Sequence, residues 1–390
     1  MKQDWEIKKL SDIGKVFNGN SINEKVKKDN YTNLDNGYPF IATKDVGFDS
    51  EIDYANGVKI PFSERKQFKI APANTPLICA EGGSAGRKIG FTNQDVCFGN
   101  KLFALVSNKN VDSKFIFYYY FNSSFQKHFT TEMTGIIGGV SMNKFKDIEI
   151  PIPPLPEQQR IVAILDEAFV VIAKAKANAQ QNLKNAKELF ESYLQGVFEN
   201  KGEGWEEKTL NEISENLDSK RVPITKNVRS EGSIPYYGAS GIVDYVNDYL
   251  FNEDLLCVSE DGANLLARTY PIAFSITGKT WVNNHAHVLR FKNMDSQKFV
   301  ELYLNSIKLD DFVSGMAQPK LNQTMLNKIP IPFPPLKTQQ TIVQKLDALN
   351  TETKKLESIY LQKINDLEEL KKSVLQKAFS GELKMEKELV

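Results

Sequence analysis

The sequence predicts an α+β protein in which two globular segments alternate in tandem with two long helices. Two observations indicate this fold class. A motif rich in isoleucine and proline occurs at residues 148–155 and again at 329–336, and a long stretch with helical periodicity follows each copy. Short runs of β-branched and aromatic residues between Gly and Asn turns, such as 102–106 and 287–291, fill the segment before each motif.

The repeat extends well beyond the proline motif. Residues 158–162 (QQRIV) match residues 339–343 (QQTIV), and Trp5-Glu6 near the start recurs as Trp205-Glu206. We therefore expect four parts: a globular domain at 1–150, a Pro hinge and helix at 151–200, a second globular domain at 201–331, and a second hinge and helix at 332–390.

Each hinge should be extended and stiff, because successive prolines cannot continue a helix or donate to a hydrogen-bond ladder. Pro156 suits the first turn of the helix that follows, and Glu157 suits its positive end. Lys337-Thr338 replaces this pair in the second copy. The first helix is predicted to continue without Pro or Gly to Gln195.

Apolar residues recur every three or four positions along both helices, as in a coiled coil. In the first helix they are Ile161, Leu165, Ala168, Ile172, Ala175, Ala179, Leu183, Ala186, Phe190, Tyr193 and Val197. In the second they are Ile342, Leu346, Leu349, Thr353, Leu356, Tyr360, Ile364, Leu367 and Val374, with Lys371 a poor match. We predict an internal antiparallel coiled coil with a pseudo-two-fold relation between the halves, which brings the tail after Phe379 near Trp5. A homodimeric coiled coil is the alternative.

Composition limits the class of protein. The chain has 390 residues, of which 41% are hydrophobic, and this is enough for two or three cores. Its three cysteines form no CxxC pair, so neither a zinc site nor a disulfide framework is indicated. No apolar run is long enough to span a membrane, and we expect a cytoplasmic protein with no membrane partner. The aromatic run 115–121 is interpreted as the face of a buried helix.

The two globular segments share only a faint pattern. Residues 39–41 align with 235–237, residues 77–79 with 255–257, and residues 100–105 with 284–289. The hinges and helices are closely repeated, whereas the globular segments diverge. This pattern is expected of two binding domains that share one frame and have different targets.

No catalytic constellation is present in the sequence. Adjacent prolines occur only in IPPL and FPPL contexts, not in the NPPY or DPPY motif of an adenine methyltransferase. Residues 82–86 (GGSAG) match neither GxGxxG nor a phosphate-binding loop. His285 and His287 make a poor zinc site by themselves, so we expect no metal.

This arrangement resembles the specificity subunits of type I restriction-modification systems. The features that carry the resemblance are Trp-Glu at the start of each half, a divergent segment, an isoleucine-proline run ending in PPLxxQQxIV, and a long helix. The resemblance covers nearly the whole chain. It implies two target-recognition domains of α/β type, each reading half of an interrupted sequence in double-stranded DNA, on a subunit that is not itself an enzyme.

The resemblance also implies partners. Two methyltransferase subunits would dock on the helices, which set the spacer between the half-sites, and restriction/translocase subunits would join them. S-adenosylmethionine, ATP and Mg²⁺ are expected on those partners, and no cofactor on this chain. A formal net charge of zero fits that division, because a protein that grips DNA alone needs excess Lys and Arg.

DNA contacts require Lys or Arg for guanine and phosphate, and Asn or Gln for adenine, on protruding loops. The turn 83–88 is the best candidate in the first half, with an ordinary surface turn as the alternative. The candidate residues are Lys44, Ser84, Arg87, Lys88, Asn100, Lys101, Tyr236, Tyr237, Arg268, Lys279, Asn284, His285 and Lys320. The two tyrosines could equally belong to the core.

Two other functions compete with this interpretation. The chain could be a non-enzymatic adaptor that carries two binding globules on a coiled-coil strut, or, less in keeping with its motifs, an enzyme. Sequence-selective DNA binding by the chain together with a methyltransferase would exclude the adaptor. Methylation of DNA by the isolated chain would establish an enzyme.

Overall fold

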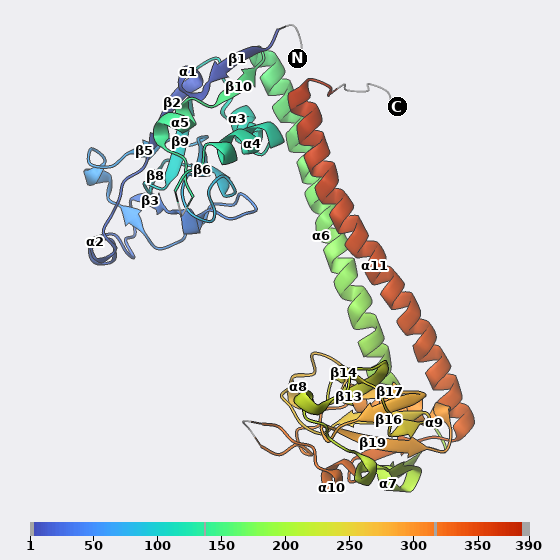
Figure 1. Cartoon of the computed structure of the whole chain (residues 1–390). Coiled ribbons are helices and arrows are strands. Elements are labelled where there is room, and N and C mark those ends of the chain that lie inside the picture. The colour runs from blue at the N-terminus through green and yellow to red at the C-terminus, as the bar shows by residue number, and fades with distance from the viewer. Residues whose placement is uncertain (1–3, 136–137, 316–317, 384–390) are drawn as a thin grey trace. The chain divides into compact units, whose positions relative to one another are not determined.

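The computed structural model describes residues 4–135, 138–315 and 318–383. The chain forms two compact units (Figure 1). Unit 1 comprises Met1–Asn178 and Lys363–Val390, and unit 2 comprises Ala179–Gln362. Each unit therefore contains one globular part together with a stretch of each long helix.

Three antiparallel or mixed sheets build the globular part of unit 1. Its elements are β1 (Glu6–Lys9), α1 (Leu10–Ile13), β2 (Gly14–Asn18), α2 (Glu24–Asn30), β3 (Tyr38–Ile41), η1 (Thr43–Asp45), β4 (Lys59–Ile60), η2 (Phe62–Glu64), β5 (Ile70–Ala71), β6 (Pro76–Cys79), β7 (Ile89–Phe91), β8 (Val96–Phe98), β9 (Leu102–Ser107), α3 (Ser113–Tyr119), α4 (Ser123–Thr131), α5 (Met142–Lys146), β10 (Glu149–Ile152) and α6 (Leu155–Glu199). The strand orders are β1-β10, β2-β9-β6-β7 and β4-β3-β8-β5, and β3 runs parallel to β8.

The globular part of unit 2 repeats this topology strand for strand. Its elements are β11 (Glu206–Thr209), α7 (Leu210–Ile213), β12 (Ser214–Asn216), η3 (Asp218–Lys220), η4 (Lys226–Val228), β13 (Ile234–Gly238), β14 (Gly241–Val246), β15 (Phe251–Asn252), β16 (Leu255–Ser259), α8 (Asn264–Ala267), β17 (Ala273–Ile276), β18 (Lys279–Val282), β19 (Ala286–Phe291), α9 (Met294–Ser306), α10 (Gln323–Leu326), β20 (Pro330–Phe333) and α11 (Leu336–Ser380). The orders are β11-β20, β12-β19-β16-β17 and β14-β13-β18-β15, with β13 parallel to β18. The predicted α+β class with two tandem domains is confirmed.

Hydrogen bonds show which residues of the two frames are equivalent. The amide of Ala80 donates to the carbonyl of Lys101 (2.8 Å), as the amide of Glu260 donates to the carbonyl of His285 (2.9 Å). This confirms the alignment of 100–105 with 284–289. The alignment of 77–79 with 255–257 is wrong by two residues, because Cys79 pairs with Leu102 whereas Ser259 pairs with Ala286. A two-residue error keeps the same residues on the same face of a strand, so the apolar pattern could not reveal it.

The proline hinges are extended, and each also forms a strand. Strand β10 pairs with β1, where Pro151 lies opposite Ile7, and β20 pairs with β11, where Pro332 lies opposite Glu207. Only alternate residues of a strand donate to one neighbour in an antiparallel ladder, so proline at the other positions removes no bond. The Trp-Glu segment and the proline motif of each half therefore form one small sheet beside the start of a long helix.

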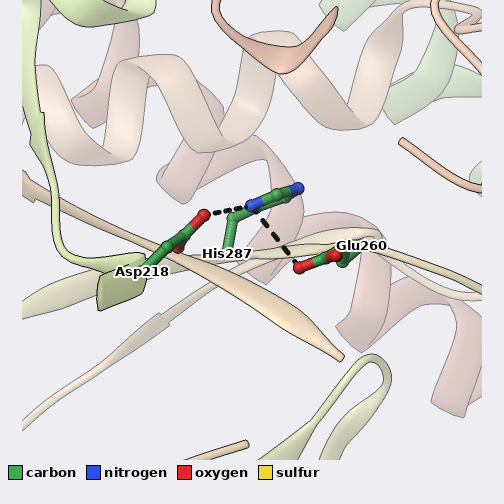
Figure 2. Close-up of side chains that lie close together, drawn as sticks. All are labelled: Asp218, Glu260 and His287. Carbon is green, nitrogen blue, oxygen red and sulfur yellow. Dashed lines mark hydrogen bonds and ion pairs between the residues drawn. The ribbon is translucent and has the colours of Figure 1, made fainter. Parts of the chain in front are cut away.

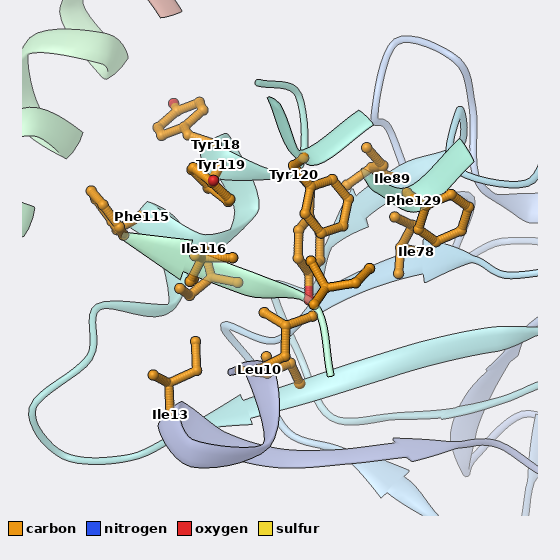
Figure 3. Close-up of a cluster of buried hydrophobic side chains, with 14 of the residues drawn as sticks. Leu10, Ile13, Ile78, Ile89, Phe115, Ile116, Tyr118, Tyr119, Tyr120 and Phe129 are labelled. Atoms are coloured by element: carbon orange, nitrogen blue, oxygen red, sulfur yellow. The ribbon is translucent and has the colours of Figure 1, made fainter. Parts of the chain in front are cut away.

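The core of unit 1 forms around α3. Phe115, Ile116, Tyr118 and Tyr119 of this helix are buried, as the aromatic run predicted (Figure 3). The ring of Phe115 lies 5.1 Å from that of Phe379, at the end of α11, and 6.4 Å from that of Trp5. The predicted proximity of the tail after Phe379 to Trp5 is confirmed as far as Leu383, because Leu383 and Trp5 both pack against this core.

Unit 2 contains the equivalent arrangement with the helices exchanged. Phe198, at the end of α6, lies 5.4 Å from Phe299 and 5.0 Å from Tyr303, and Trp205 lies 5.9 Å from Phe299. The last two positions predicted for the first apolar seam are wrong, because Leu194 and Phe198 are the buried residues, not Tyr193 and Val197. The seam shifts here because the helix end packs into the globular core rather than along a helix.

Within each unit the two helical stretches run antiparallel. In unit 1, Arg160 near the start of α6 donates to the carbonyl of Leu383 just beyond α11 (3.2 Å), and Lys176 pairs with Glu368. In unit 2, Leu194 and Phe198 of α6 share a hydrophobic cluster with Val343 and Leu346 of α11. Among the described residues, no helix has both the length and the apolar character needed to cross a membrane.

Candidate nucleic-acid interface

Turns that are far apart in the sequence gather at one edge of the globular part of unit 1. We call them the first loop cluster: residues 43–48, 81–88, 99–101 and 138–140. Lys88 Nζ donates to the carbonyl of Thr43 (3.1 Å), and the amide of Gly82 donates to the carbonyl of Gly138 (2.8 Å). Lys101 Nζ lies 3.9 Å from Glu81 Oε2. These contacts hold four turns in a fixed relation.

The glycine at position 86 of the turn 81–88 is required by its geometry. Gly86 has a φ of +71°, and a Cβ there would lie 2.8 Å from Cδ1 of the buried Phe129. The amides of Arg87 and Lys88 both donate to the carbonyl of Ser84 (3.0 and 3.2 Å). The chain therefore turns tightly over the aromatic core and presents two consecutive cations at its end.

All six candidates predicted in the first half lie in the first loop cluster. The exposed ones are Lys44, Arg87, Asn100 and Lys101, and the half-buried ones are Ser84 and Lys88. Lys88 is held by Thr43 and is less free to move toward a ligand than Arg87, whose guanidinium makes one long contact with the carbonyl of Gly83 (3.4 Å).

Sequence reasoning missed Phe48 in this cluster. Its side chain is 61% exposed, and Arg87 Cζ and Lys88 Nζ lie 5.0 and 5.2 Å from the centre of its ring. Phe48 stands in a segment that the second half does not repeat, so the internal alignment gave no signal for it. A Phe between Gly and Asp in a polar turn was the available clue.

The equivalent turns of unit 2 form the second loop cluster: residues 260–264, 283–285 and 318–321. The amide of Gly262 donates to the carbonyl of Pro319 (3.0 Å), as Gly82 does to Gly138 in unit 1. His285 Nδ1 lies 2.7 Å from Asp261 Oδ2, and Lys320 Nζ lies 3.1 Å from Glu260 Oε1.

Three candidates, the exposed residues Asn284, His285 and Lys320, lie in the second loop cluster. The other four lie outside it, although the backbone carbonyl of Tyr237 accepts from the amide of Asn283 in that cluster (3.0 Å). Tyr236 is 1% exposed, and its hydroxyl accepts from the amide of Ile224 (3.0 Å). The half-buried Tyr237 stacks on Phe274. The sequence left the tyrosines open between core and surface, and the structure packs both rings against neighbouring side chains.

Arg268 and Lys279 also lie away from the second loop cluster. The guanidinium of Arg268 donates to the carbonyls of Leu304 and Ile307 (3.2 and 2.6 Å) at the end of α9, and burial lowers its pKa. Lys279 stands at the start of β18, whereas residues 283–285 follow the end of that strand. Its Nζ lies 4.9 Å from the ring centre of Tyr249.

Beneath the second loop cluster lies a buried ion network formed by Asp218, Glu260 and His287 (Figure 2) together with Arg221. His287 Nδ1 lies 2.6 Å from Asp218 Oδ2, and its Nε2 lies 2.7 Å from the carbonyl oxygen of Leu321. Both partners are acceptors, so the geometry fits a ring that donates from both nitrogens and carries a positive charge. Arg221 Nη1 lies 2.7 Å from Glu260 Oε2.

The network keeps both of its carboxyl groups ionised. Burial acts to raise the pKa of Asp218, but the hydrogen bond and charge of His287, the Val288 amide and Arg221 together lower it. Burial likewise opposes ionisation of Glu260, and Arg221, His287 and Lys320 lower its pKa. Desolvation is therefore outweighed by specific partners.

Asp218, Glu260 and His287 could each offer one ligand atom to a metal ion, and those atoms lie within 4.8 Å of one another. Arg221 occupies the same cluster, and with His287 it balances the two carboxylates. We therefore interpret these residues as an internal ion network that fixes the turns above it, since a cation would have to displace two existing positive partners.

The chain is similar to known proteins over nearly its whole length. Residues 2–184 and 202–368 match the family model described as type I restriction modification DNA specificity domain. A putative type I restriction enzyme specificity subunit from Haemophilus influenzae is 36% identical over a stretch that covers 42% of this chain and 41% of that protein. The MjaIX specificity subunit from Methanocaldococcus jannaschii is 24% identical, over 98% of this chain and 94% of that one. A chain from a structure described as showing complex assembly and conformational transition of the type I R-M system has a TM-score of 0.77 at 17% identity, and the match covers 98% of this chain and 99% of that one.

Proposed function

Because this chain belongs to the family of type I restriction-modification DNA specificity domains, we propose that it reads a bipartite sequence in double-stranded DNA, one half with each globular domain. It is a specificity subunit with two recognition domains in tandem, a role without chemistry of its own. The alternative of a coiled-coil adaptor without DNA specificity is not favoured by that membership.

The observation that carries the proposal is one strand topology that bears two different sets of turns. The frames of β2-β9-β6-β7 and β12-β19-β16-β17 agree, whereas the turns at their edges differ in length and charge. Loops on a rigid scaffold are where binding specificity usually lies. Two unlike loop clusters on like frames are suited to two unlike half-sites.

The exposed side chains of the loop clusters supply the chemistry of base recognition. In the first cluster Arg87, Lys44 and Lys101 can donate to guanine or phosphate, and Asn100 can pair with adenine. In the second cluster Asn284, His285 and Lys320 take these roles. The other six candidates are better suited to supporting the turns, because each is at least partly engaged within its own domain or lies away from the loop cluster. They are Ser84, Lys88, Tyr236, Tyr237, Arg268 and Lys279.

Charge supports a division of labour with partner subunits. Formal net charge is zero, and the second loop cluster holds Glu260 and Asp261 beside its cations. Much of the affinity for phosphate must then come from other chains. We propose two methyltransferase subunits, which would bind S-adenosylmethionine, and restriction/translocase subunits, which would use ATP and Mg²⁺.

The long helices offer a docking surface for the methyltransferase subunits. Large apolar side chains stand exposed outside the seams, at Val170, Val171, Ile359, Leu361 and Leu370. Exposed apolar side chains on these helices are available for contact with a partner protein. In this proposal the same helices hold the half-sites at a fixed spacing, so bases in the spacer are not read.

Selection from a randomised DNA duplex library tests the proposed function. The full chain with its methyltransferase partner is expected to enrich duplexes that carry two short sequence blocks separated by a constant number of unspecified pairs. Enrichment of no sequence over random DNA would contradict the proposal and favour an adaptor. The methyltransferase alone is the control, and it should enrich nothing.

A further inference from the structure

Phe48 is an exposed aromatic side chain within reach of two cations. Its ring is 61% exposed, and the guanidinium of Arg87 and the ammonium of Lys88 lie 5.0 and 5.2 Å from the ring centre. Single exposed apolar residues are common on protein surfaces. This one differs because consecutive cations of a glycine-rich turn stand beside it.

The turn that carries Phe48 is rigid. The amide of Gly47 donates to the carbonyl of Glu51 (2.8 Å), and the amide of Glu51 donates to Asp49 Oδ1 (3.1 Å). Val46 and Ile52 close the turn as a β-bridge, and both side chains are buried in the same hydrophobic cluster. The ring is therefore presented from a fixed base.

The segment with Phe48 belongs to the first domain alone. In unit 1 residues 42–58 connect β3 to β4, whereas in unit 2 the chain passes from β13 to β14 through Ala239 and Ser240. The extra segment is tied to the glycine-rich turn by the bond from Lys88 Nζ to the carbonyl of Thr43. An insertion fixed against the candidate DNA-binding turn adds a contact that the second domain lacks at this point.

We propose that Phe48 is an apolar wedge that inserts between two stacked base pairs of the first half-site while Arg87, beside it, contacts an adjacent base edge or phosphate. Proteins that kink duplexes in this way combine an inserted apolar side chain with cations on the backbone. This inference rests on the proposed function and adds to it. In this view the protein reads the first half-site partly through how readily one of its base steps unstacks. Pyrimidine–purine steps unstack most easily and are the expected preference.

The test uses the full chain with its methyltransferase partner and duplexes that carry 2-aminopurine at successive positions of the first half-site. Binding of the unchanged protein should raise the fluorescence at one step. F48A should abolish that rise and weaken binding by about 5- to 150-fold, the range that corresponds to the loss of one aromatic–base stack. F48L, which keeps apolar volume, should retain part of the rise.

Phe62 provides the matched control, because it is 59% exposed in the same domain and packs on Tyr38, away from the cations. F62A should keep both the fluorescence rise and the affinity. If the unchanged protein binds its bipartite site and F48A has the same affinity and fluorescence, the wedge is overturned while the proposed function stands. If F48A lowers only assembly with the methyltransferase, Phe48 contacts protein and the wedge is equally overturned. Thermal unfolding of F48A, expected to be unchanged, separates these outcomes from misfolding.

Discussion

Lys101 and His285 occupy the same point of the repeated frame, and each stands beside an acid of the preceding turn. Lys101 Nζ lies 3.9 Å from Glu81 Oε2, and His285 Nδ1 lies 2.7 Å from Asp261 Oδ2. One structural position thus carries a permanent cation in one domain and an imidazole in the other. Under the proposed function, the acid in each domain competes with DNA for that side chain.

That competition predicts that removing an acid strengthens binding. Glu81→Gln should raise the affinity for DNA by up to about fivefold, because an exposed ion pair is weak and its loss frees Lys101. The measurement is equilibrium binding of the full chain with its partner at low and moderate salt. Weaker binding by Glu81→Gln would show that Glu81 itself contacts a base.

Arg87 should contribute to the first half-site alone. Arg87→Ala is expected to weaken binding by roughly 1–3 kcal/mol and to relax selectivity within one block of the recognised sequence. Lys109→Ala is the control, since Lys109 is exposed in the same domain outside the loop clusters. Equal loss of selectivity in both blocks would count against separate reading by two domains.

The end of α11 should stabilise the first globular domain as a core element. Phe379 is buried against Phe115 and Tyr119, and Phe379→Ala should lower the free energy of unfolding of unit 1 by about 3–5 kcal/mol. Leu370→Ala, at an exposed position of the same helix, should change it little. Denaturant unfolding followed by the fluorescence of Trp5, in a background with Trp205→Phe and Trp281→Phe, measures both. Equal values for the two variants would be inconsistent with this packing.

The buried glutamine of the first hinge should stabilise the fold. Gln158 is fully buried, accepts from the amide of Asp112 (2.8 Å) and donates to the carbonyl of Pro153 (2.8 Å). Gln158→Leu leaves these groups unpaired and should cost about 1–3 kcal/mol for each. Gln159→Leu is the exposed control. Thermal unfolding measures both, and a neutral Gln158→Leu would mean that water satisfies the hinge.

The ion network should make unit 2 sensitive to acid. The pKa of Asp218 is lowered in the fold, so its stabilising effect is complete above its unfolded pKa of about 4 and is lost as the pH falls through its folded pKa. Asp218→Asn should cost about 3–5 kcal/mol at neutral pH and flatten the loss below pH 4. In a Trp5→Phe background, the change in tryptophan fluorescence on unfolding comes from Trp205 and Trp281, which both lie in unit 2. An unchanged acid profile in Asp218→Asn would assign that sensitivity to other groups.

Features encoded by local or repeated patterns could be predicted from the sequence. Prolines and helical periodicity predict the hinges and most of the seams, and the repeat aligns Lys101 with His285. Contacts between distant segments could not be predicted in this way. His287 meets Asp218 across 69 positions of the chain, and nothing in either neighbourhood names the other.

The candidate site shows the same division. Cations on glycine-rich turns were found in the first domain because loop chemistry is local. Arg268 and Tyr236 were chosen by residue type, but the fold directs one to helix-end carbonyls and buries the other. Phe48 was not predicted because it lies in an insertion and is apolar, whereas the residue types expected at a DNA interface are polar or charged.

Mapping of methylated adenines in cells that express this chain with its partner subunits tests the central claim most directly. We predict that every methylated site shares one interrupted sequence, two specified blocks with a constant unspecified spacer, and that the pattern disappears when this chain is removed. A contiguous recognition sequence, or a methylation pattern that persists without the chain, would contradict the account.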